Sequence, residues 1–391
     1  MAHFLSHLEC SKCSRKHDPN EPQTVCVECK GVLLARYDLD KVAKALSKND
    51  LRSRVGSMWR YRELLPIKEE KNIVTLGEGF TPILQLKRLG PKLGFKHLFL
   101  KDDGQIPTGS FKARGMSAAI SKCKELGIGK VAVPTAGNAG AAMSAYAAQA
   151  GIEAHVYMPR ETPEVIKLEC AVYGAQVTVV DGTIADAGKL VGEGTARKVW
   201  FEMSTMKEPY RVEGKKTMGF EIAEQFEWTL PDVILYPTGG GTGIVGMAKA
   251  FDELESIGWI KGARPRFVAV QTSGCAPIAK AIQDHKGNCD FWENAKTIAA
   301  GLRVPKPYAD YLIIKAVNAS KGTSTVVSEE ELLKSVKLLA RTEGNWICPE
   351  GGATIASLPH LLEEGVVDRD ENVVLYNTGV GILYQETARE P

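Results

Sequence analysis

Short apolar runs alternate with longer stretches of helical periodicity through the middle of the chain, between residues 95 and 271. The apolar runs are continuous, and they span residues 97–101, 131–133, 155–158, 177–180, 199–201, 233–236 and 267–270. The helical stretches span residues 111–126, 138–149, 164–173, 185–197, 216–226 and 244–257. Continuous apolar strands that alternate with helices are typical of parallel sheets covered by helices on both faces. The pattern therefore predicts an α/β fold.

The C-terminal third adds two predicted helices and one buried strand, at residues 329–342, 352–362 and 373–376. A length of 391 residues is enough for two domains with additional segments. We predict a smaller, mobile α/β domain over residues 105–205 and a large domain formed by residues 36–104 and 206–391. Residues 1–35 form a separate N-terminal segment.

The composition is that of an ordinary globular protein, with 44% hydrophobic and 25% charged residues. The formal net charge is only +2, so no excess of charge favours binding to nucleic acid or to an anionic membrane. The sequence shows no secretory signal pattern and no apolar run long enough to span a bilayer. Nine cysteines cannot all pair within one chain, which indicates a reducing compartment. We therefore expect a soluble cytoplasmic protein.

Four of the cysteines form two CxxC pairs separated by twelve residues: Cys10, Cys13, Cys26 and Cys29. Each pair can bind one metal ion from a tight turn, and four thiolates complete a tetrahedron around zinc. The N-terminal segment is too short to build a core of its own, so a metal would stabilise it. The spacing predicts a structural zinc ribbon, because four cysteines leave no open position for catalysis. A degenerate ribbon with free cysteines is the alternative.

The segment KDDGQIPTGSFKARG, residues 101–115, places Lys112 in the first turn of a predicted helix, with Ser110 as its N-cap. A lysine held at the positive end of a helix dipole loses its proton more easily. An easily deprotonated lysine suits the formation of a Schiff base. An ordinary exposed lysine is the alternative at this spacing.

Two further polar residues stand where predicted strands end. Asn138 follows the strand at residues 131–133 and begins a helix, where it can donate to a phenolate oxygen or act as a plain N-cap. Thr378 follows the last strand, at the edge where open α/β sheets bind ligands. Ordinary turn chemistry is the alternative for Thr378.

A glycine-rich loop lies between the strand at residues 233–236 and the following helix, and it contains Gly239, Gly240, Gly241, Thr242 and Gly243. Such a loop lets backbone amides close on an anion at a helix N-terminus. The same glycines, with Gly246, fit the dinucleotide fingerprint GxGxxG, which requires an acidic residue near the end of the next strand. That strand ends at Gln271 without an acid, so a phosphate site is favoured over a nicotinamide site.

The segment TGSFKARG resembles the lysine segment PTGSFKDRG of threonine synthases, which belong to the tryptophan-synthase-β group of pyridoxal-phosphate enzymes. The resemblance continues in pieces from Thr75 to Tyr384. It implies a two-domain fold-type-II architecture with parallel sheets covered by helices. In this family the lysine carries the cofactor, and the resemblance implies this role for Lys112. In the family an asparagine faces the 3-oxygen of the cofactor, a glycine loop holds its 5′-phosphate, and a C-terminal threonine meets its ring nitrogen. The resemblance implies these roles for Asn138, Gly239–Gly243 and Thr378, respectively.

The segment PYRVEGKKT, residues 209–217, resembles the threonine synthase segment NPxRxEGQKT. In that family the arginine, with a nearby serine, meets the phosphate of O-phosphohomoserine, which places Arg211 and Ser204. The implied reaction adds water at Cβ after phosphate leaves Cγ and forms threonine. A solvated basic turn is the alternative reading, more readily for Lys215 than for Arg211. The resemblance also leads us to expect a small amino-acid substrate and a homodimer.

Several positions depart from the family pattern: Ala113, Ala139, Met203, Leu383 and the loop sequence GGGTG. Some of these positions would touch the substrate phosphate, so other reactions of the same fold stay open. These are threonine or serine ammonia-lyase activity and a β-replacement reaction. A non-enzymatic alternative is an interaction scaffold that carries a zinc ribbon.

Overall fold

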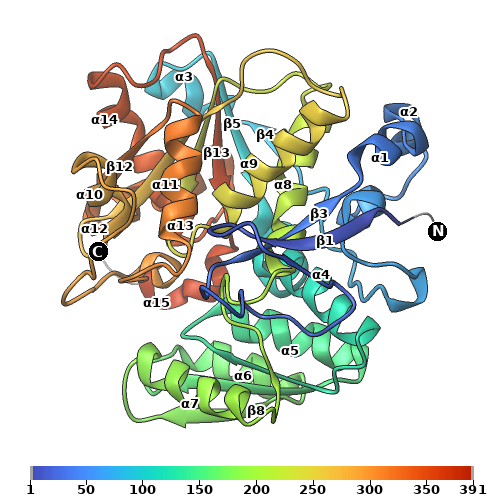
Figure 1. Ribbon diagram of the computed structural model, residues 1–391. Helices are drawn as coiled ribbons and strands as arrows, with labels where there is room; N and C mark the ends of the chain where they lie inside the picture. The colour runs from blue at the N-terminus through green and yellow to red at the C-terminus, as the bar shows by residue number, and fades with distance from the viewer. Residues whose placement is uncertain (1–2, 389–391) are drawn as a thin grey trace.

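Three β-sheets organise the chain, and the computed structural model describes residues 3–388 (Figure 1). The largest sheet has the strand order β12-β11-β10-β13-β5-β4. Its members are β4 (Ile83–Gln85), β5 (His97–Asp102), β10 (Val233–Pro237), β11 (Arg266–Thr272), β12 (Thr323–Val327) and β13 (Asn372–Asn377). All neighbouring strands are parallel except β4, which runs antiparallel to β5.

A second, all-parallel sheet has the order β8-β7-β6-β9. Its strands are β6 (Lys130–Pro134), β7 (Glu153–Pro159), β8 (Gln176–Val180) and β9 (Phe201–Glu202). In Figure 1 this sheet lies at the bottom with α5, α6 and α7. The sheet falls within residues 105–205, while the proposed domain boundaries and the mobility of this part stay a prediction.

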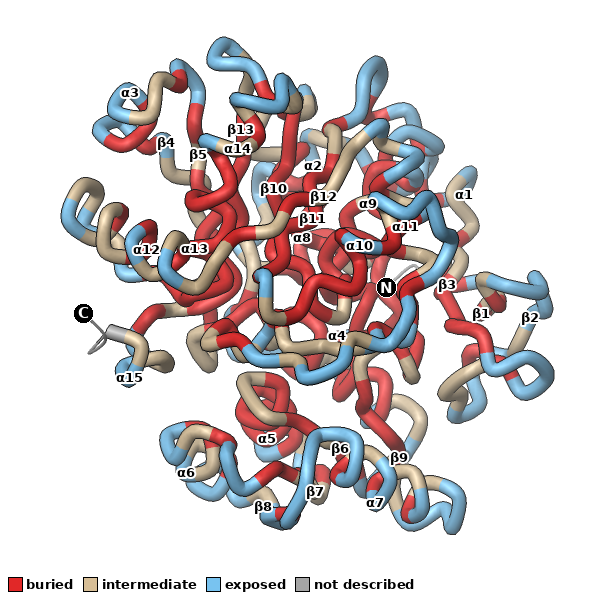
Figure 2. Tube along the Cα trace, turned by 90° about the vertical axis from the view of Figure 1, so that its left-hand side faces the viewer, coloured by how far each residue is buried: buried red, intermediate tan, exposed pale blue. Residues whose placement is uncertain are grey.

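Helices cover both sheets, as the continuous apolar strands predicted. The longer ones are α4 (Lys112–Glu125), α5 (Asn138–Ala150), α6 (Glu164–Val172), α7 (Ile184–Ala196), α8 (Arg211–Gln225), α9 (Thr242–Ser256), α11 (Asp310–Ala319), α12 (Glu329–Glu343) and α13 (Pro349–Ala356). The shorter ones are α1 (Leu39–Ala45), α2 (Lys48–Arg52), α3 (Leu89–Leu93), α10 (Pro277–Gln283), α14 (Leu358–Glu363) and α15 (Gln385–Ala388). Figure 2 shows buried positions gathered along β10, β13 and α8, and exposed positions on the outer helices.

Within residues 3–388 there are also six short 3-10 helices: η1 (Met58–Leu64), η2 (Glu70–Asn72), η3 (Asp103–Gln105), η4 (Pro107–Gly109), η5 (Ala300–Leu302) and η6 (Gly381–Tyr384). Two of them, η3 and η4, form the connection between β5 and α4. Within the described part of the chain, no helix is long and apolar enough to cross a membrane.

The N-terminal segment forms an antiparallel three-stranded sheet of order β2-β1-β3, with β1 (Leu5–Cys10), β2 (Lys16–His17) and β3 (Leu33–Tyr37). It packs directly against the α/β body. The hydroxyl of Tyr311, on α11, accepts from the backbone N–H of Val32 at 3.3 Å and lies 2.6 Å from the hydroxyl of Ser11. Tyr37 donates to buried Glu213 on α8 at 2.8 Å. The ribbon-like segment is therefore fixed to α8 and α11.

The predicted α/β fold is confirmed, and the local differences have simple causes. The predicted cap at Ser110 is wrong, because α4 begins at Lys112, its N-cap is Phe111, and the buried hydroxyl of Ser110 has no hydrogen-bond partner. The helix predicted over residues 352–362 is two helices, α13 and α14, which meet at Ser357, and Pro359 stands in the first turn of α14. The sequence pattern missed β12, α10 and α11.

Candidate active site

Lys112 and Thr378 are brought together by neighbouring strands of the large sheet. Since β5 and β13 are parallel, their carboxyl ends reach the same edge. Beyond that edge, the backbone N–H of Phe111 donates to the carbonyl of Thr378 at 3.0 Å, and Ser110 forms a β-bridge with Gly379. Two segments more than 250 residues apart in the sequence therefore form one wall of the site.

The amine of Lys112 has an environment that favours its neutral form. It lies 3.8 Å from the ring centroid of Phe111. Burial, and then the nearby guanidinium of Arg211, lower the pKa of Lys112 to about 8, against the raising effects of Glu350 and Cys348. The sequence predicted a lowered pKa from the helix dipole, and the structure identifies burial as the leading cause.

A second lysine stands beside Lys112. The side chain of Lys215 is buried, its amine lies 3.8 Å from the same Phe111 ring, and it donates to the Phe111 carbonyl. Burial, together with the neighbouring charge of Lys112, lowers the pKa of Lys215 well below its usual value. The reading of Lys215 as part of a solvated turn is therefore wrong.

The glycine-rich loop connects β10 to the N-terminus of α9, as the sequence predicted. The N–H groups of Gly239, Gly240 and Gly241 donate to no other group among residues 3–388. Gly241 has a φ of +70°, which favours glycine, and a Cβ there would meet Ile313. A Cβ on Gly239 would lie 2.1 Å from the carbonyl oxygen of Gly301. Free amides at the N-terminus of a fifteen-residue helix are the arrangement that anions favour in proteins.

Arg211 and Ser204 lie close together in the sequence, Ser204 just after β9 and Arg211 at the start of α8. Both residues are buried, at 2% and 8% exposure. One guanidinium nitrogen of Arg211 donates to the carbonyl of Met203 at 2.6 Å, while its Nε and the hydroxyl of Ser204 have no partner. Among the described residues, no carboxylate lies within ion-pair distance of the Arg211 guanidinium, although the nearby charge of Glu208 partly opposes the lowering of the Arg211 pKa by burial. The acidic group of Glu208 instead accepts from the backbone N–H of Arg211.

Asn138 is the first residue of α5, and Gly137 is the N-cap, so the plain N-cap reading of Asn138 is wrong. Its side-chain amide donates to the hydroxyl of Tyr384 at 3.1 Å. The Tyr384 hydroxyl lies 3.3 Å from Oε1 of Glu350, which also accepts from the backbone N–H of Gly301 at 2.7 Å. The structure thus links Asn138 to the large sheet through two residues that no sequence motif marked.

The four N-terminal cysteines converge as the spacing predicted. Their sulfur atoms all lie within 4.8 Å of one another. The Sγ atoms of Cys10 and Cys29 are 3.4 Å apart, and those of Cys13 and Cys26 are 3.7 Å apart. None of the four forms a disulfide. Four sulfurs at this separation can surround one metal ion.

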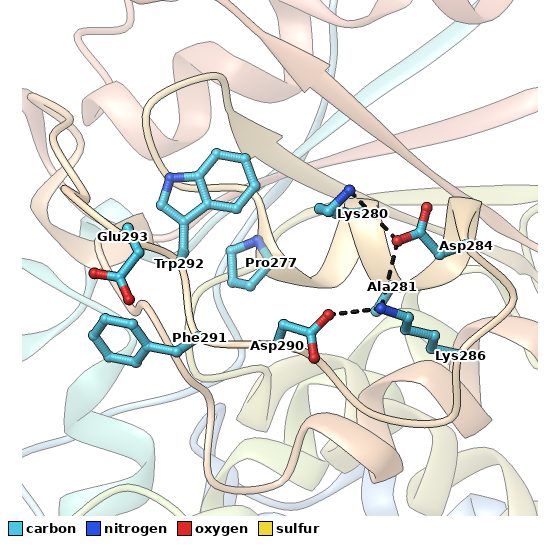
Figure 3. Close-up of a pocket in the computed structure, with 9 residues that line it drawn as sticks. All are labelled: Pro277, Lys280, Ala281, Asp284, Lys286, Asp290, Phe291, Trp292 and Glu293. Carbon is cyan, nitrogen blue, oxygen red and sulfur yellow. Dashed lines mark hydrogen bonds and ion pairs between the residues drawn. The ribbon is translucent and has the colours of Figure 1, made fainter.

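An open surface pocket of about 400 Å³ lies elsewhere, between α10 and the loop that follows it (Figure 3). Its lining contains none of the predicted site residues and consists of Pro277, Lys280, Ala281, Asp284, Lys286, Asp290, Phe291, Trp292 and Glu293. Lys286 pairs with Asp290 at 2.6 Å, and Lys280 with Asp284 at 3.4 Å. Because these charges compensate one another, the pocket offers no free cation to an anionic ligand.

Comparison with known proteins identifies the family of this chain. The model of the pyridoxal-phosphate dependent enzyme family matches residues 74–379. A threonine synthase of Methanocaldococcus jannaschii is 37% identical over 97% of this chain and 93% of its own length. A threonine synthase of Methanosarcina acetivorans is 36% identical over 96% of this chain and 91% of its own. Maize serine racemase shares the fold, with a TM-score of 0.69 at 22% identity over 85% of this chain and 97% of its own. The chain therefore belongs to the pyridoxal-phosphate dependent enzymes, in the family that includes the threonine synthases.

Proposed function

We propose that this protein is a threonine synthase, which converts O-phospho-L-homoserine and water into L-threonine and phosphate. The observation that carries the proposal is the buried guanidinium of Arg211, which has no carboxylate partner among the described residues and stands with the unpartnered hydroxyl of Ser204. A buried, unpaired cation is costly unless a ligand compensates it. The planar fork of arginine suits a phosphate. The threonine synthases similar to this chain over nearly its full length support the same assignment.

The residues at the edge of the large sheet fit pyridoxal phosphate. The free amides of the glycine loop, Gly239–Gly243, would hold the 5′-phosphate, and Lys112 would hold the cofactor covalently. Asn138 would donate to the 3-oxygen, and the buried hydroxyl of Thr378 would meet the ring nitrogen. When bound, pyridoxal phosphate supplies the electron sink that lets protons leave carbon atoms of an amino acid.

The side chains of this chain would then share the remaining work. Lys112, with its pKa lowered to about 8, can give and take protons at Cα and Cβ of the substrate near neutral pH. Arg211 and Ser204 would bind the substrate phosphate and stabilise its charge as the bond from Cγ to oxygen breaks. Water supplies the hydroxyl that forms a bond with Cβ, the proton taken from Cβ is returned to Cγ, which becomes the methyl group, and the remaining proton of water goes to the released phosphate. A neutral hydroxyl at Thr378, in place of a carboxylate, would leave the ring nitrogen of the cofactor largely unprotonated, which would suit elimination and replacement.

Replacing Arg211 with alanine tests this assignment. A charge-assisted hydrogen bond to arginine contributes about 1.5–3 kcal/mol. We therefore expect kcat/KM for O-phosphohomoserine to fall roughly tenfold or more. Slow elimination from serine or threonine, which carry no phosphate, should change far less in the same variant. The measurement follows release of phosphate, ammonia and 2-oxoacid across these substrates.

The ammonia-lyase alternative makes the opposite forecast. An enzyme that acts on threonine or serine needs no phosphate anchor, so Arg211→Ala would lower all rates by similar factors. Equal losses across the substrates, or no phosphate release by the unmodified protein, would overturn the threonine synthase assignment. A β-replacement enzyme would instead require a second nucleophilic substrate before product forms.

We also propose that Cys10, Cys13, Cys26 and Cys29 bind one structural zinc ion. Protein purified without chelators should contain about one zinc per chain. The Cys13→Ser/Cys29→Ser variant should lose it, and its thermal midpoint should fall by about 5 °C or more, because a loss of a few kcal/mol shifts a protein of this size on that scale.

The control for the zinc site is treatment with a strong chelator. It should lower the midpoint of the unmodified protein and leave that of the double variant unchanged. Purified protein without zinc would contradict the proposal. Loss of activity on zinc removal with an unchanged cofactor spectrum would contradict a purely structural role.

The wider cellular setting belongs to the same proposal. We infer a cytoplasmic homodimer that acts on a small amino acid and binds neither nucleic acid nor membrane. The near-neutral net charge and the unpaired cysteines support this setting, and the family resemblance supports the dimer. Sedimentation at the monomer mass of 42.5 kDa alone would contradict the dimer.

A further inference from the structure

Three polar side chains from separate parts of the chain form one hydrogen-bonded line. Asn138 comes from the first turn of α5, Tyr384 from the end of η6 and Glu350 from the first turn of α13. The amide of Asn138 is 3.1 Å from the Tyr384 hydroxyl, and that hydroxyl is 3.3 Å from Oε1 of Glu350. The line therefore joins the helix that packs on the small sheet to two segments attached to the large one.

The acceptor at one end fixes the direction of donation along the whole line. The carboxylate of Glu350 only accepts, so the single proton of the Tyr384 hydroxyl is committed to it. The hydroxyl can then only accept from Asn138, which requires the amide nitrogen, and not the amide oxygen, to face Tyr384. Burial raises the pKa of Tyr384 well above its usual value, so this proton stays in place at neutral pH.

We propose that Tyr384 and Glu350 are positioning residues, which fix the amide of Asn138 with its nitrogen toward Tyr384 and leave its second N–H free for the 3-oxygen of pyridoxal phosphate. This inference rests on the proposed role of Asn138. Without the line, the amide can turn over and present its oxygen to the oxygen of the cofactor. Such an arrangement replaces an attraction by a repulsion.

Glu350 supports the site from a second direction. Its side chain is 4% exposed, and Oε1 also accepts from the N–H of Gly301 at 2.7 Å. The carbonyl of Gly301 approaches Gly239 so closely that a Cβ there would lie 2.1 Å away. One carboxylate thus holds both the asparagine line and the backbone packed against the glycine loop.

The test uses protein freed of cofactor and titrated with pyridoxal phosphate, and binding is followed by protein fluorescence. In Tyr384→Phe, one hydrogen bond and the amide orientation are lost, so we expect the Kd to rise about fivefold to tenfold. The absorption maximum of the bound cofactor should also shift, because its 3-oxygen loses a donor. The matched control is Tyr308→Phe, which removes a hydroxyl that donates to the ribbon at Lys30, away from the line.

Glu350→Gln supplies the decisive comparison. Glutamine keeps the shape of the side chain but can donate a hydrogen bond to Tyr384. The Tyr384 hydroxyl is then free to donate to Asn138, so the orientation of the Asn138 amide is no longer fixed. We expect the same spectral shift as in Tyr384→Phe, and the double variant should be no worse than Glu350→Gln alone, because both changes break one line. Additive effects, or an unshifted spectrum in Tyr384→Phe, would overturn the proposal.

The experiments distinguish a failure of the positioning role from a failure of the proposed function. If Tyr384→Phe binds the cofactor with unchanged Kd and spectrum while the unmodified protein still releases phosphate from O-phosphohomoserine, only the positioning role fails. If the unmodified protein releases no phosphate but the spectral shift appears, the positioning role stands and the substrate assignment fails.

Discussion

The Lys112→Ala variant is expected to lose covalent attachment of pyridoxal phosphate, and its turnover should fall by about a hundredfold to ten-thousandfold. That range is the usual contribution of an acid–base residue, and the loss of attachment adds to it. Borohydride reduction fixes the cofactor to the lysine that holds it, and mass spectrometry of peptides then identifies that lysine. In the unmodified protein the label should lie on the peptide that contains Lys112.

The neighbouring Lys215 makes this experiment discriminating. Its amine lies over the same Phe111 ring and its pKa is also lowered by burial, so a label on the Lys215 peptide would transfer the cofactor assignment to α8. Lys124→Ala, at an exposed position on the same helix as Lys112, is the control and should retain both label and turnover. Unchanged far-ultraviolet circular dichroism would show that Lys112→Ala still folds.

The sequence was most informative where one physical requirement dominates. Strand β10 reads VILYP and all five residues are buried, so only a strand covered on both faces explains the run. Strand β12 reads TSTVV and mixes polar with apolar residues, because it lies at the edge of the sheet. Its pattern resembles a loop, which is why the sequence pattern missed it.

Some residues of the candidate site could likewise be predicted from the sequence, and others could not. Lys112, the glycine loop and Thr378 were predictable, because each follows a strand whose carboxyl end must reach the ligand edge. The contribution of Tyr384 was not, since its partners Asn138 and Glu350 lie 246 and 34 residues away in the sequence and no local rule joins them. Pairings of this kind depend on how helices and loops pack in three dimensions.

A buried ion network lies beneath the loop that carries Lys112 and was also absent from the sequence reading. Arg114 donates to Asp103 at 2.8 Å and to Glu221, which also pairs with Lys101 at 2.8 Å. All four side chains are fully buried. Two cations and two anions balance, so the network is neutral only as a whole. It ties the start of α4 to β5 and α8 and thereby holds the backbone of Lys112.

Glu221→Gln should therefore lower the free energy of unfolding by about 3–5 kcal/mol, the usual cost of removing one partner from a buried ion pair. Glutamine keeps the size of the side chain, so the loss reports charge. Burial opposes ionisation of Glu221, yet Arg114 and Lys101 lower its pKa to about 2. Its contribution is complete above the unfolded value of about 4.3 and is lost as the pH falls toward 2.

Equilibrium unfolding in urea at pH 7 and at pH 3 measures both the loss of stability in Glu221→Gln and its dependence on pH. The free energy of unfolding of Glu221→Gln should be much lower than that of the unmodified protein at pH 7, and the difference should be smaller at pH 3. Glu330→Gln, in the exposed pair with Lys334, is the matched control and should change nothing measurable, because solvent screens that pair. A difference at pH 7 no larger than that of the control would show that the network is not needed to hold α4. The position of Lys112 would then depend on the contacts of Phe111 with Thr378 and Lys215.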